Sequence, residues 1–327
     1  MTLVFATPPV VTTADARGLL LPCSTDDWSS EVDPRNWTPP TTTLYDDAMM
    51  ALWSGTPSDL SAFGTRILVN SVYLEIWQAK HGHGPWLPED WKERHYVVLE
   101  TLQTHIKQED VLSFGIRKAN VKVNSDECDP LVRNADYILY GCYYSLGTDT
   151  TFLEEAFCHC SGAAICRALK LTYSQFDSSK VDMRSIRAGA HVYSDAVSRG
   201  LKFISHTGCW TNGLECAFGG FFAGILLIHW VRRIEELQQI TPEEAHILAE
   251  LRKAMEEGDV QIYPESLAAS LARSCIQLMD QVYIFGITPF MGNAFRLYAE
   301  EILGSRAAIM DIEPVLLEDE QRSEYGD

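Results

Sequence analysis

The feature that most constrains the fold is one long apolar run, Leu214–Val231, which reads LECAFGGFFAGILLIHWV. A helix that spans a bilayer needs about 20 apolar residues, and this run is almost that long. It contains Glu215 and His229, however, and the rest of the chain has no second run of this kind. We therefore predict a central helix that is buried by other helices, and no membrane span.

Helical periodicity recurs from Ser58 towards the end of the chain, whereas strand signals are scarce. Two helix starts are clear because a threonine precedes a proline at Thr241-Pro242 and at Thr288-Pro289, and Glu244 completes a capping box. Gly258 and Gly304 are expected stops. The prediction is an all-α fold of about nine helices, covering Asp59–Lys80, Asp90–Ile106, Pro130–Leu146, Thr151–Leu171, Met183–His206, Asn212–Gln239, Pro242–Glu257, Glu265–Phe285 and Pro289–Leu303.

The ends of the chain differ from this helical body. Residues 1–57 contain repeated prolines, with Trp28, Trp37 and Trp53 between them, so we expect an extended segment that wraps over the helices. Residues 311–327 form an acidic tail that we expect to be loose. No linker rich in proline, glycine or serine interrupts residues 58–310, which we assign to a single domain.

Net charge and cysteine usage indicate which partners and which cellular compartment suit this chain. The chain has 45 acidic and 26 basic side chains and a formal charge of −19, which opposes direct binding to a nucleic acid. Its nine cysteines are odd in number and mostly lie among apolar residues, as in proteins of a reducing compartment. The first residues lack the features of a signal peptide. We expect a cytoplasmic protein, and homo-oligomerisation remains open.

Signatures of metals and cofactors are absent from the sequence. Cys158-His159-Cys160 lacks the paired spacing of a zinc site, because helical positions 158 and 160 point roughly 200° apart. No phosphate-binding glycine loop, dinucleotide fingerprint, nucleophile elbow or zinc-hydrolase helix occurs. We expect no metal and no cofactor.

Two groups of residues are candidates for a site. Glu215, Phe222 and His229 lie along one stripe of the apolar helix, where they either pair with core partners or form the wall of a substrate pocket. Just before it, His206, Trp210 and Asn212 lie in a glycine-bounded joint and are candidate catalytic donors, although Asn212 also suits a helix cap. Tyr143 belongs to a tyrosine-rich helix that suits the core, and it is retained as a substrate-binding candidate.

Several segments together resemble a known family. They are Leu21-Pro22-Cys23 leading to Trp28 and Trp37, Ala51-Leu52-Trp53, Ile67–Trp77, Leu201–Trp230, Gly286-Ile287-Thr288 and Tyr298-Ala299. This set is similar to the regulatory (middle homology) region of fungal-specific transcription factors. The resemblance implies an all-α array.

Family members that regulate genes carry a zinc module ahead of this region, and no such module is found after Met1. Two functions follow as expectations. The first is a cofactor-independent pericyclic cyclase of Diels–Alder type acting on an apolar terpenoid or polyketide, similar to the norbornene-forming cyclases of sordarin-type fungal biosynthesis. A shaped apolar cavity and one positioned hydrogen-bond donor suffice for such a reaction. The alternative is a ligand-sensing or protein-binding regulatory domain that binds no DNA itself, which implies a nuclear location.

Overall fold

The structure is a computed structural model that describes residues 13–23, 41–56, 59–82, 87–120, 130–198, 213–237, 240–281 and 286–322. These residues form eleven α-helices, a short 3-10 helix and two short strands, so the all-α prediction is confirmed, with more helices than the nine expected. The α-helices are α3 (Tyr45–Trp53), α4 (Ala62–Gly82), α5 (Trp91–Asn120), α6 (Pro130–Gly147), α7 (Thr151–Phe157), α8 (Gly162–Ser174), α9 (Met183–Ser198), α11 (Leu214–Leu237), α12 (Pro242–Glu257), α13 (Leu267–Gln281) and α14 (Thr288–Arg322).

The N-terminal segment is more structured than its prolines indicate. Strand β1 (Leu20–Pro22) pairs antiparallel with β2 (Thr42–Leu44), with Leu21 opposite Thr43. Helix α3 follows β2 directly and buries Met49 and Leu52. The expectation of an extended wrap is therefore corrected for residues 45–53, because they present apolar side chains at helical spacing to the core.

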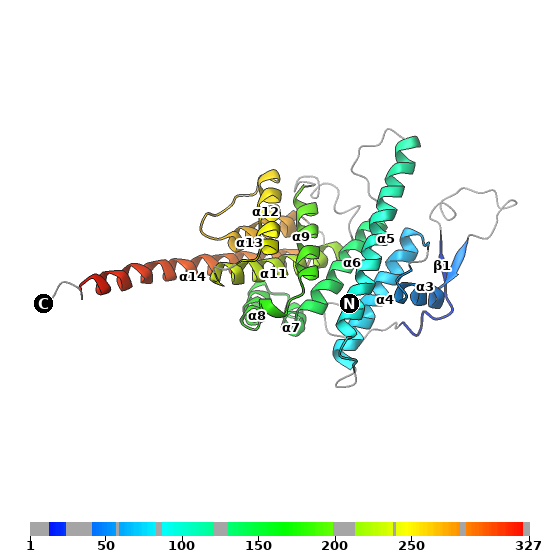
Figure 1. Ribbon diagram of the computed structural model, residues 1–327, viewed down its shortest axis with the longest axis horizontal. Helices are drawn as coiled ribbons and strands as arrows, with labels where there is room; N and C mark the ends of the chain where they lie inside the picture. The colour runs from blue at the N-terminus through cyan, green and yellow to red at the C-terminus, as the bar shows by residue number, and fades with distance from the viewer. Residues whose placement is uncertain are drawn as a thin grey trace.

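Two apolar cores organise the molecule. One is formed by α3, α4, α5 and α6, and the other by α7, α8 and the helices from α11 to α14. In Figure 1, α3, α4 and α5 lie on one side of α6, and the later helices lie on the other side. Helices α9 and α11 contribute to both cores, since Val192 and Ala223 join the first and Tyr193 and Phe222 join the second.

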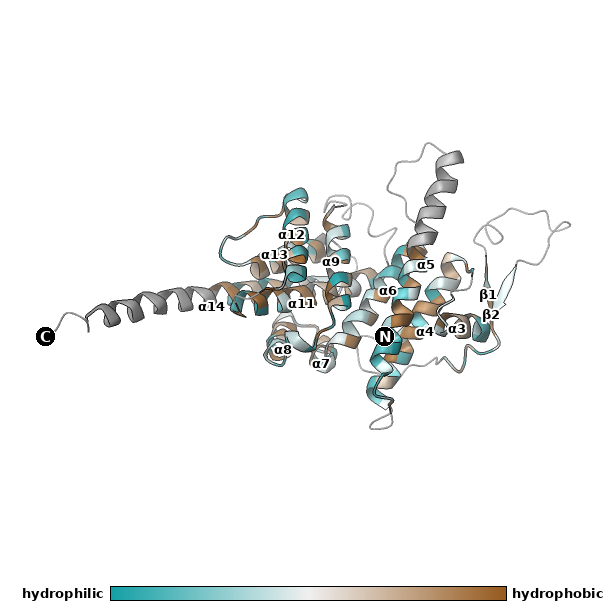
Figure 2. Cartoon of the chain, viewed as in Figure 1, coloured by the Kyte–Doolittle hydropathy of each residue, from teal (hydrophilic) through white to brown (hydrophobic). Residues whose placement is uncertain are grey.

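Helix α11 contains the long apolar run. Fifteen of its residues are buried, including Phe221 and Trp230. It is long and apolar enough to cross a membrane by length and composition, and 78% of its most apolar window is buried inside the protein. In Figure 2, α11 is brown among its neighbours, whereas much of α12 is hydrophilic. This placement agrees with the predicted central helix.

The predicted helix Thr151–Leu171 is two helices. Helix α7 ends at Phe157, and Cys160 then adopts a left-handed backbone with φ of 44°. Ser161 caps the next helix, α8, by accepting a hydrogen bond from the backbone N–H of Ala164. A Cβ at Gly162 would lie 2.5 Å from the side-chain nitrogen of Asn293, so this glycine allows α8 to approach α14 closely.

The expected helix starts and stops have mixed outcomes. Thr241 and Glu244 form the predicted capping box of α12, and this helix ends at Gly258 as predicted. Thr288, in contrast, is already the first residue of α14, and this helix continues through Gly304 to Arg322. Glycine inside a helix costs only about 1 kcal/mol relative to alanine, so one glycine does not stop a long helix. The expected loose tail is therefore helical over residues 311–322.

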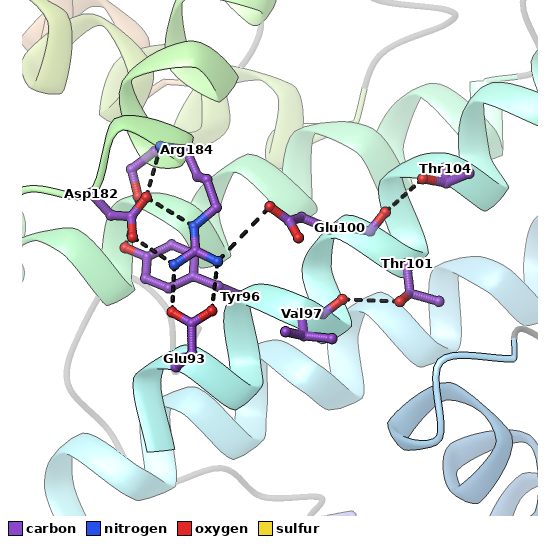
Figure 3. Close-up of polar contacts among 9 residues, drawn as sticks. Glu93, Tyr96, Val97, Glu100, Thr101, Thr104, Asp182 and Arg184 are labelled. Atoms are coloured by element: carbon purple, nitrogen blue, oxygen red, sulfur yellow. Dashed lines mark hydrogen bonds and ion pairs between the residues drawn. The ribbon is translucent and has the colours of Figure 1, made fainter. Parts of the chain in front are cut away.

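A partly buried arginine, Arg184, joins the two sides of the molecule (Figure 3). Arg184, near the start of α9, forms hydrogen bonds of 3.0 and 2.6 Å with the two carboxylate oxygens of Glu93 on α5. It also binds Asp182 at 2.6 Å, and its guanidinium lies 4.2 Å from the ring centroid of Tyr96. Its hydrogen bonds hold the pKa values of Asp182 and Glu93 below their usual range.

Candidate functional site

A cavity of about 270 Å³ lies where α11 crosses α4 and α6. Its wall is mostly aromatic and aliphatic, with one amide and one carboxylate. The lining residues are Asn70 and Tyr73 of α4, Tyr137, Ile138 and Gly141 of α6, and Leu214, Glu215, Phe218, Gly219 and Phe222 of α11. Ligand pockets usually have this composition, and their volumes start at roughly 300 Å³, so this cavity suits a compact apolar molecule.

Two glycines bring the three helices together at the cavity. A Cβ at Gly219 would lie 2.7 Å from the carbonyl oxygen of Tyr137, and a Cβ at Gly141 would lie 3.0 Å from the ring of Tyr73. Neither distance leaves room for a larger side chain at the glycine. Gly141 and Gly219 therefore set the spacing of the cavity walls.

The first turn of α11 is anchored at the edge of the cavity. The side-chain oxygen of Asn134 accepts hydrogen bonds from the backbone N–H of Gly213 at 3.0 Å and from the thiol of Cys216 at 3.0 Å. Glu215 forms an ion pair with Arg66 of α4, and both side chains are 27% exposed. Because the pair is partly exposed, it lies at the rim of the cavity. The carboxylate of Glu215 is thus already paired with a cation.

The inner wall is built by stacked aromatic rings. Phe222 stacks on Tyr144 with ring centroids 4.8 Å apart and an angle of 12° between the ring planes. Phe218 makes an edge contact with Phe157 at 5.4 Å. Offset stacking and edge contacts of this kind hold rings in place, so the apolar wall is preformed.

Polar groups at the cavity are neutral apart from the rim pair. The Asn70 amide donates a hydrogen bond of 2.8 Å to the carbonyl oxygen of Arg66. The hydroxyl of Tyr73 bonds to the hydroxyl of Ser145 at 3.1 Å, and burial raises the pKa of Tyr73 far above its usual value. Tyr73 is therefore a phenol at any physiological pH, and neither group is suited to proton abstraction.

His229 lies far from this cavity. It is 14 positions after Glu215, which is about 21 Å along a helix. It is 1% exposed and lies among Tyr173, Phe176 and Tyr298, with ring centroids 5.4 to 5.7 Å away. Neither ring nitrogen has a hydrogen-bond partner among the described residues, and burial together with the Arg232 charge lowers its pKa to about 3. The predicted stripe thus divides between the cavity and the second core.

The other predicted site residues have separate positions. Tyr143 is 2% exposed in the first core, where its ring lies 6.0 Å from the ring of Tyr96, and it does not line the cavity. His206, Trp210 and Asn212 lie outside the described residues. Of the sequence candidates, Glu215 and Phe222 meet at the cavity.

The cysteines considered as metal ligands are free thiols in the structure. Cys158 and Cys160 are exposed free thiols, and Cys166 is a buried free thiol. No group of three or more histidine, cysteine, aspartate or glutamate side chains in the described ranges is arranged to hold a metal ion.

The half of the cavity that α4 and α6 provide was not predicted from the sequence. Arg66, Asn70 and Tyr73 occur in an ordinary amphipathic helix. Only tertiary structure distinguishes them, because Arg66 pairs with Glu215 of α11 and Asn70 and Tyr73 line the cavity. The one available signal was the pair of glycines, Gly141 and Gly219, in otherwise apolar helices. Glycine in a helix interior is often a sign of close packing or space for a ligand.

Comparison with known families supplies the next observation. Residues 156–297 match the fungal transcription factor C-terminal domain. The match begins at the end of α7 and ends within α14, so it includes all of α11 and one wall of the cavity. No curated protein and no solved structure shows significant similarity to the chain.

This match bears on the two expected functions. A fungal transcription factor domain agrees with the resemblance drawn from the sequence and with the regulatory alternative. The comparisons give no support to a cyclase. They are also consistent with the nuclear location that the regulatory alternative implies, while the cytoplasmic expectation has no support.

Proposed function

We propose that this chain is a regulatory region of a fungal transcription factor whose cavity between α4, α6 and α11 binds an apolar small-molecule effector. The observation that carries the proposal is the position of the cavity, since one wall belongs to the matched domain and the other two to the preceding helices. A ligand there contacts both parts of the chain at once. It therefore stabilises one relative arrangement of the two.

Helix α11 provides the route from the cavity to the rest of the molecule. Its first turns line the cavity, and its later residues Trp230 and Val231 are buried in the core that includes α13 and α14. A ligand changes a conformational equilibrium by the difference between its affinities for the two states. Contacts on Phe218 and Phe222 bias the position of α11, and this bias extends to helices that do not touch the ligand.

The cavity also indicates the chemistry of the effector. Its wall offers aromatic and aliphatic surface, the Asn70 amide and a rim ion pair, with no unpaired cation among the described lining residues. A neutral, compact, largely apolar compound with one hydrogen-bonding group matches this wall. A terpenoid or polyketide fragment of that size is the class we test.

The test is a thermal-shift screen of the full chain with a panel of neutral terpenoids and polyketides. Leu214→Trp is the blocking variant, because Leu214 lines the cavity and is 43% exposed at the first residue of α11. Leu237→Trp is the matched control, because Leu237 is the last residue of the same helix and is 57% exposed. A hit should raise the Tm of the wild type and of the control but not of the blocked variant.

The regulatory and catalytic functions are distinguished by whether the bound compound is recovered unchanged. An intramolecular cyclisation leaves the mass unchanged, so the recovered compound is compared by chromatographic retention and NMR. Unchanged ligand, with increased hydrogen-exchange protection in α11 and α13, supports regulation. A rearranged product would support the cyclase instead, and equal Tm shifts in Leu214→Trp and Leu237→Trp would exclude the cavity.

A further inference from the structure

A second pocket, of about 610 Å³, lies where the ends of α4, α6 and α8 meet the start of α5. It is separate from the cavity described above, with which it shares no lining residue. We call it the lysine pocket, after Lys80, Lys92 and Lys180. Its lining also includes two aspartates, Asp149 and Asp177, and the aromatic residues Trp91 and Phe176.

Lys80 is held in place in this pocket by the end of α6. Its ammonium group donates hydrogen bonds of 2.9 Å to the carbonyl oxygens of Ser145 and Thr148. A lysine ammonium has three N–H donors, so one donor remains. Among the described residues no carboxylate lies within ion-pair distance of Lys80. Burial lowers its pKa, although the charges of Asp149 and Glu154 act on it from further away and raise the pKa by less. The side chain is thus fixed by two carbonyl oxygens, and no carboxylate of the described residues contacts its ammonium group directly.

The charge balance of the pocket is opposite to that of the protein. The whole chain has 45 acidic and 26 basic side chains. The pocket lining has three lysines and two aspartates, and Asp177 is already paired with Lys180 at 3.1 Å. Asp149 accepts hydrogen bonds of 3.0 and 2.7 Å from the N–H and hydroxyl of Thr151. Among the lining residues, lysines therefore outnumber aspartates in a strongly acidic protein, although the charge of Glu154 also acts on Lys80.

Apolar surface adjoins these cations. Phe176 and Val181 are buried side chains of the pocket floor, and Trp91 and Leu87 are partly buried in its wall. A cation beside aromatic and aliphatic surface suits an anion with an apolar body, because the charged hydrogen bond fixes one end and burial stabilises the other.

We propose that the lysine pocket binds a small organic anion, whose carboxylate or phosphate contacts Lys80 while its apolar body packs against Trp91 and Phe176. Lys92 and Lys180 lie at the exposed part of the pocket and add attraction for the same charge. This ligand differs in class from the neutral effector of the cavity. The chain therefore has two sites that respond to different chemistry.

The test is calorimetric titration of the full chain with phenyl phosphate, benzoate, inorganic phosphate and benzyl alcohol. We expect saturable binding of phenyl phosphate or benzoate with a Kd below about 1 mM, and much weaker binding of the neutral alcohol and of inorganic phosphate. Lys80→Met should weaken binding about tenfold or more, because a hydrogen bond to a charged group is lost. The double variant Lys92→Gln/Lys180→Gln should weaken it several-fold without disturbing a buried residue.

Controls separate this site from general charge effects and from the cavity. Lys170→Gln and Lys253→Gln remove exposed lysines outside the pocket and should leave the Kd unchanged. Leu214→Trp should also leave it unchanged, so a failure of the cavity proposal does not affect this result. The proposal is overturned if neither anion binds with a Kd below about 1 mM or if the alcohol binds as tightly as the anions. It is also overturned if the double variant Lys92→Gln/Lys180→Gln binds the anion as tightly as the wild type.

Discussion

Arg66 of α4 forms an ion pair with Glu215 in the first turn of α11, although 149 positions separate them in the sequence. The pair closes one edge of the cavity and joins the N-terminal helices to the matched domain. A carboxylate in the first turn of a helix is also favoured by the helix dipole. Glu215 therefore helps to hold the start of α11 against α4, whether or not a ligand is bound.

Replacement of Arg66 with methionine should decrease the free energy of unfolding by about 0.5 to 1 kcal/mol, since the pair is partly exposed and screened by solvent. Urea denaturation measures this change. In a double-mutant cycle, Arg66→Met should have almost no effect in a Glu215→Gln background. Arg94→Met breaks a more exposed pair with Asp90 and should cost less. Equal losses in both Glu215 backgrounds would show that the ion pair contributes nothing.

Gly219 and Gly304 predict opposite effects of the same substitution. A Cβ at Gly219 would lie 2.7 Å from the carbonyl oxygen of Tyr137, whereas nothing lies within 4 Å of a Cβ at Gly304. Gly219→Ala should therefore destabilise the fold by about 1 to 3 kcal/mol through overpacking. Gly304→Ala should stabilise α14 by up to about 1 kcal/mol, because alanine favours the helix. A comparison of the two urea midpoints checks the sign of both effects.

The sequence was sufficient for most helices because their signals are local. The capping box of Thr241 and Glu244 and the periodicity of residues 130–146 are both properties of neighbouring residues, and both helices appear where they were expected. Helix α3 was missed because nearby prolines dominate the composition of the first 57 residues. The division of α7 from α8 was missed because it depends on the left-handed backbone of Cys160 and on the contact of Gly162 with Asn293.

The candidate site was predicted only in part, because a cavity is a relationship between helices. Glu215 and Phe222 could be proposed from their spacing on one helix. Their partners Arg66 and Tyr144 lie elsewhere in the chain, and periodicity does not say which faces meet. The same limit explains His229, since residues on one helical stripe can have different surroundings when they are about 21 Å apart.

The partly buried Arg184 should stabilise the fold, because it joins α9 to α5 (Figure 3). Arg184→Met leaves the carboxylates of Asp182 and Glu93 without their cation and removes the contact with the Tyr96 ring. We expect a loss of about 1 to 3 kcal/mol in the free energy of unfolding, measured in urea. Arg187→Met is the control, because its pair with Glu243 is more exposed and should be worth under about 1 kcal/mol.

His229 should make the protein sensitive to mild acid. Its pKa is about 3 in the folded state, while a histidine in an unfolded chain has a pKa of about 6.5. Between these values the unfolded state binds a proton that the folded state does not. The contribution of this pKa difference to the free energy of unfolding is therefore fully present above pH 6.5 and is lost as the pH falls towards 3. Between pH 7 and pH 5 the loss is about 2 kcal/mol.

His229→Phe removes the titrating group and keeps an aromatic ring among Tyr173, Phe176 and Tyr298. Urea denaturation at pH 7 and pH 5 should show a difference between the two pH values that is smaller than in the wild type by about 2 kcal/mol. His95 and His105, whose pKa values are also lowered by burial, remain in both proteins, so the comparison isolates position 229. The exposed His246→Gln should leave the wild-type difference unchanged. If His229→Phe retains the full acid sensitivity of the wild type, His229 gains a partner or solvent on protonation.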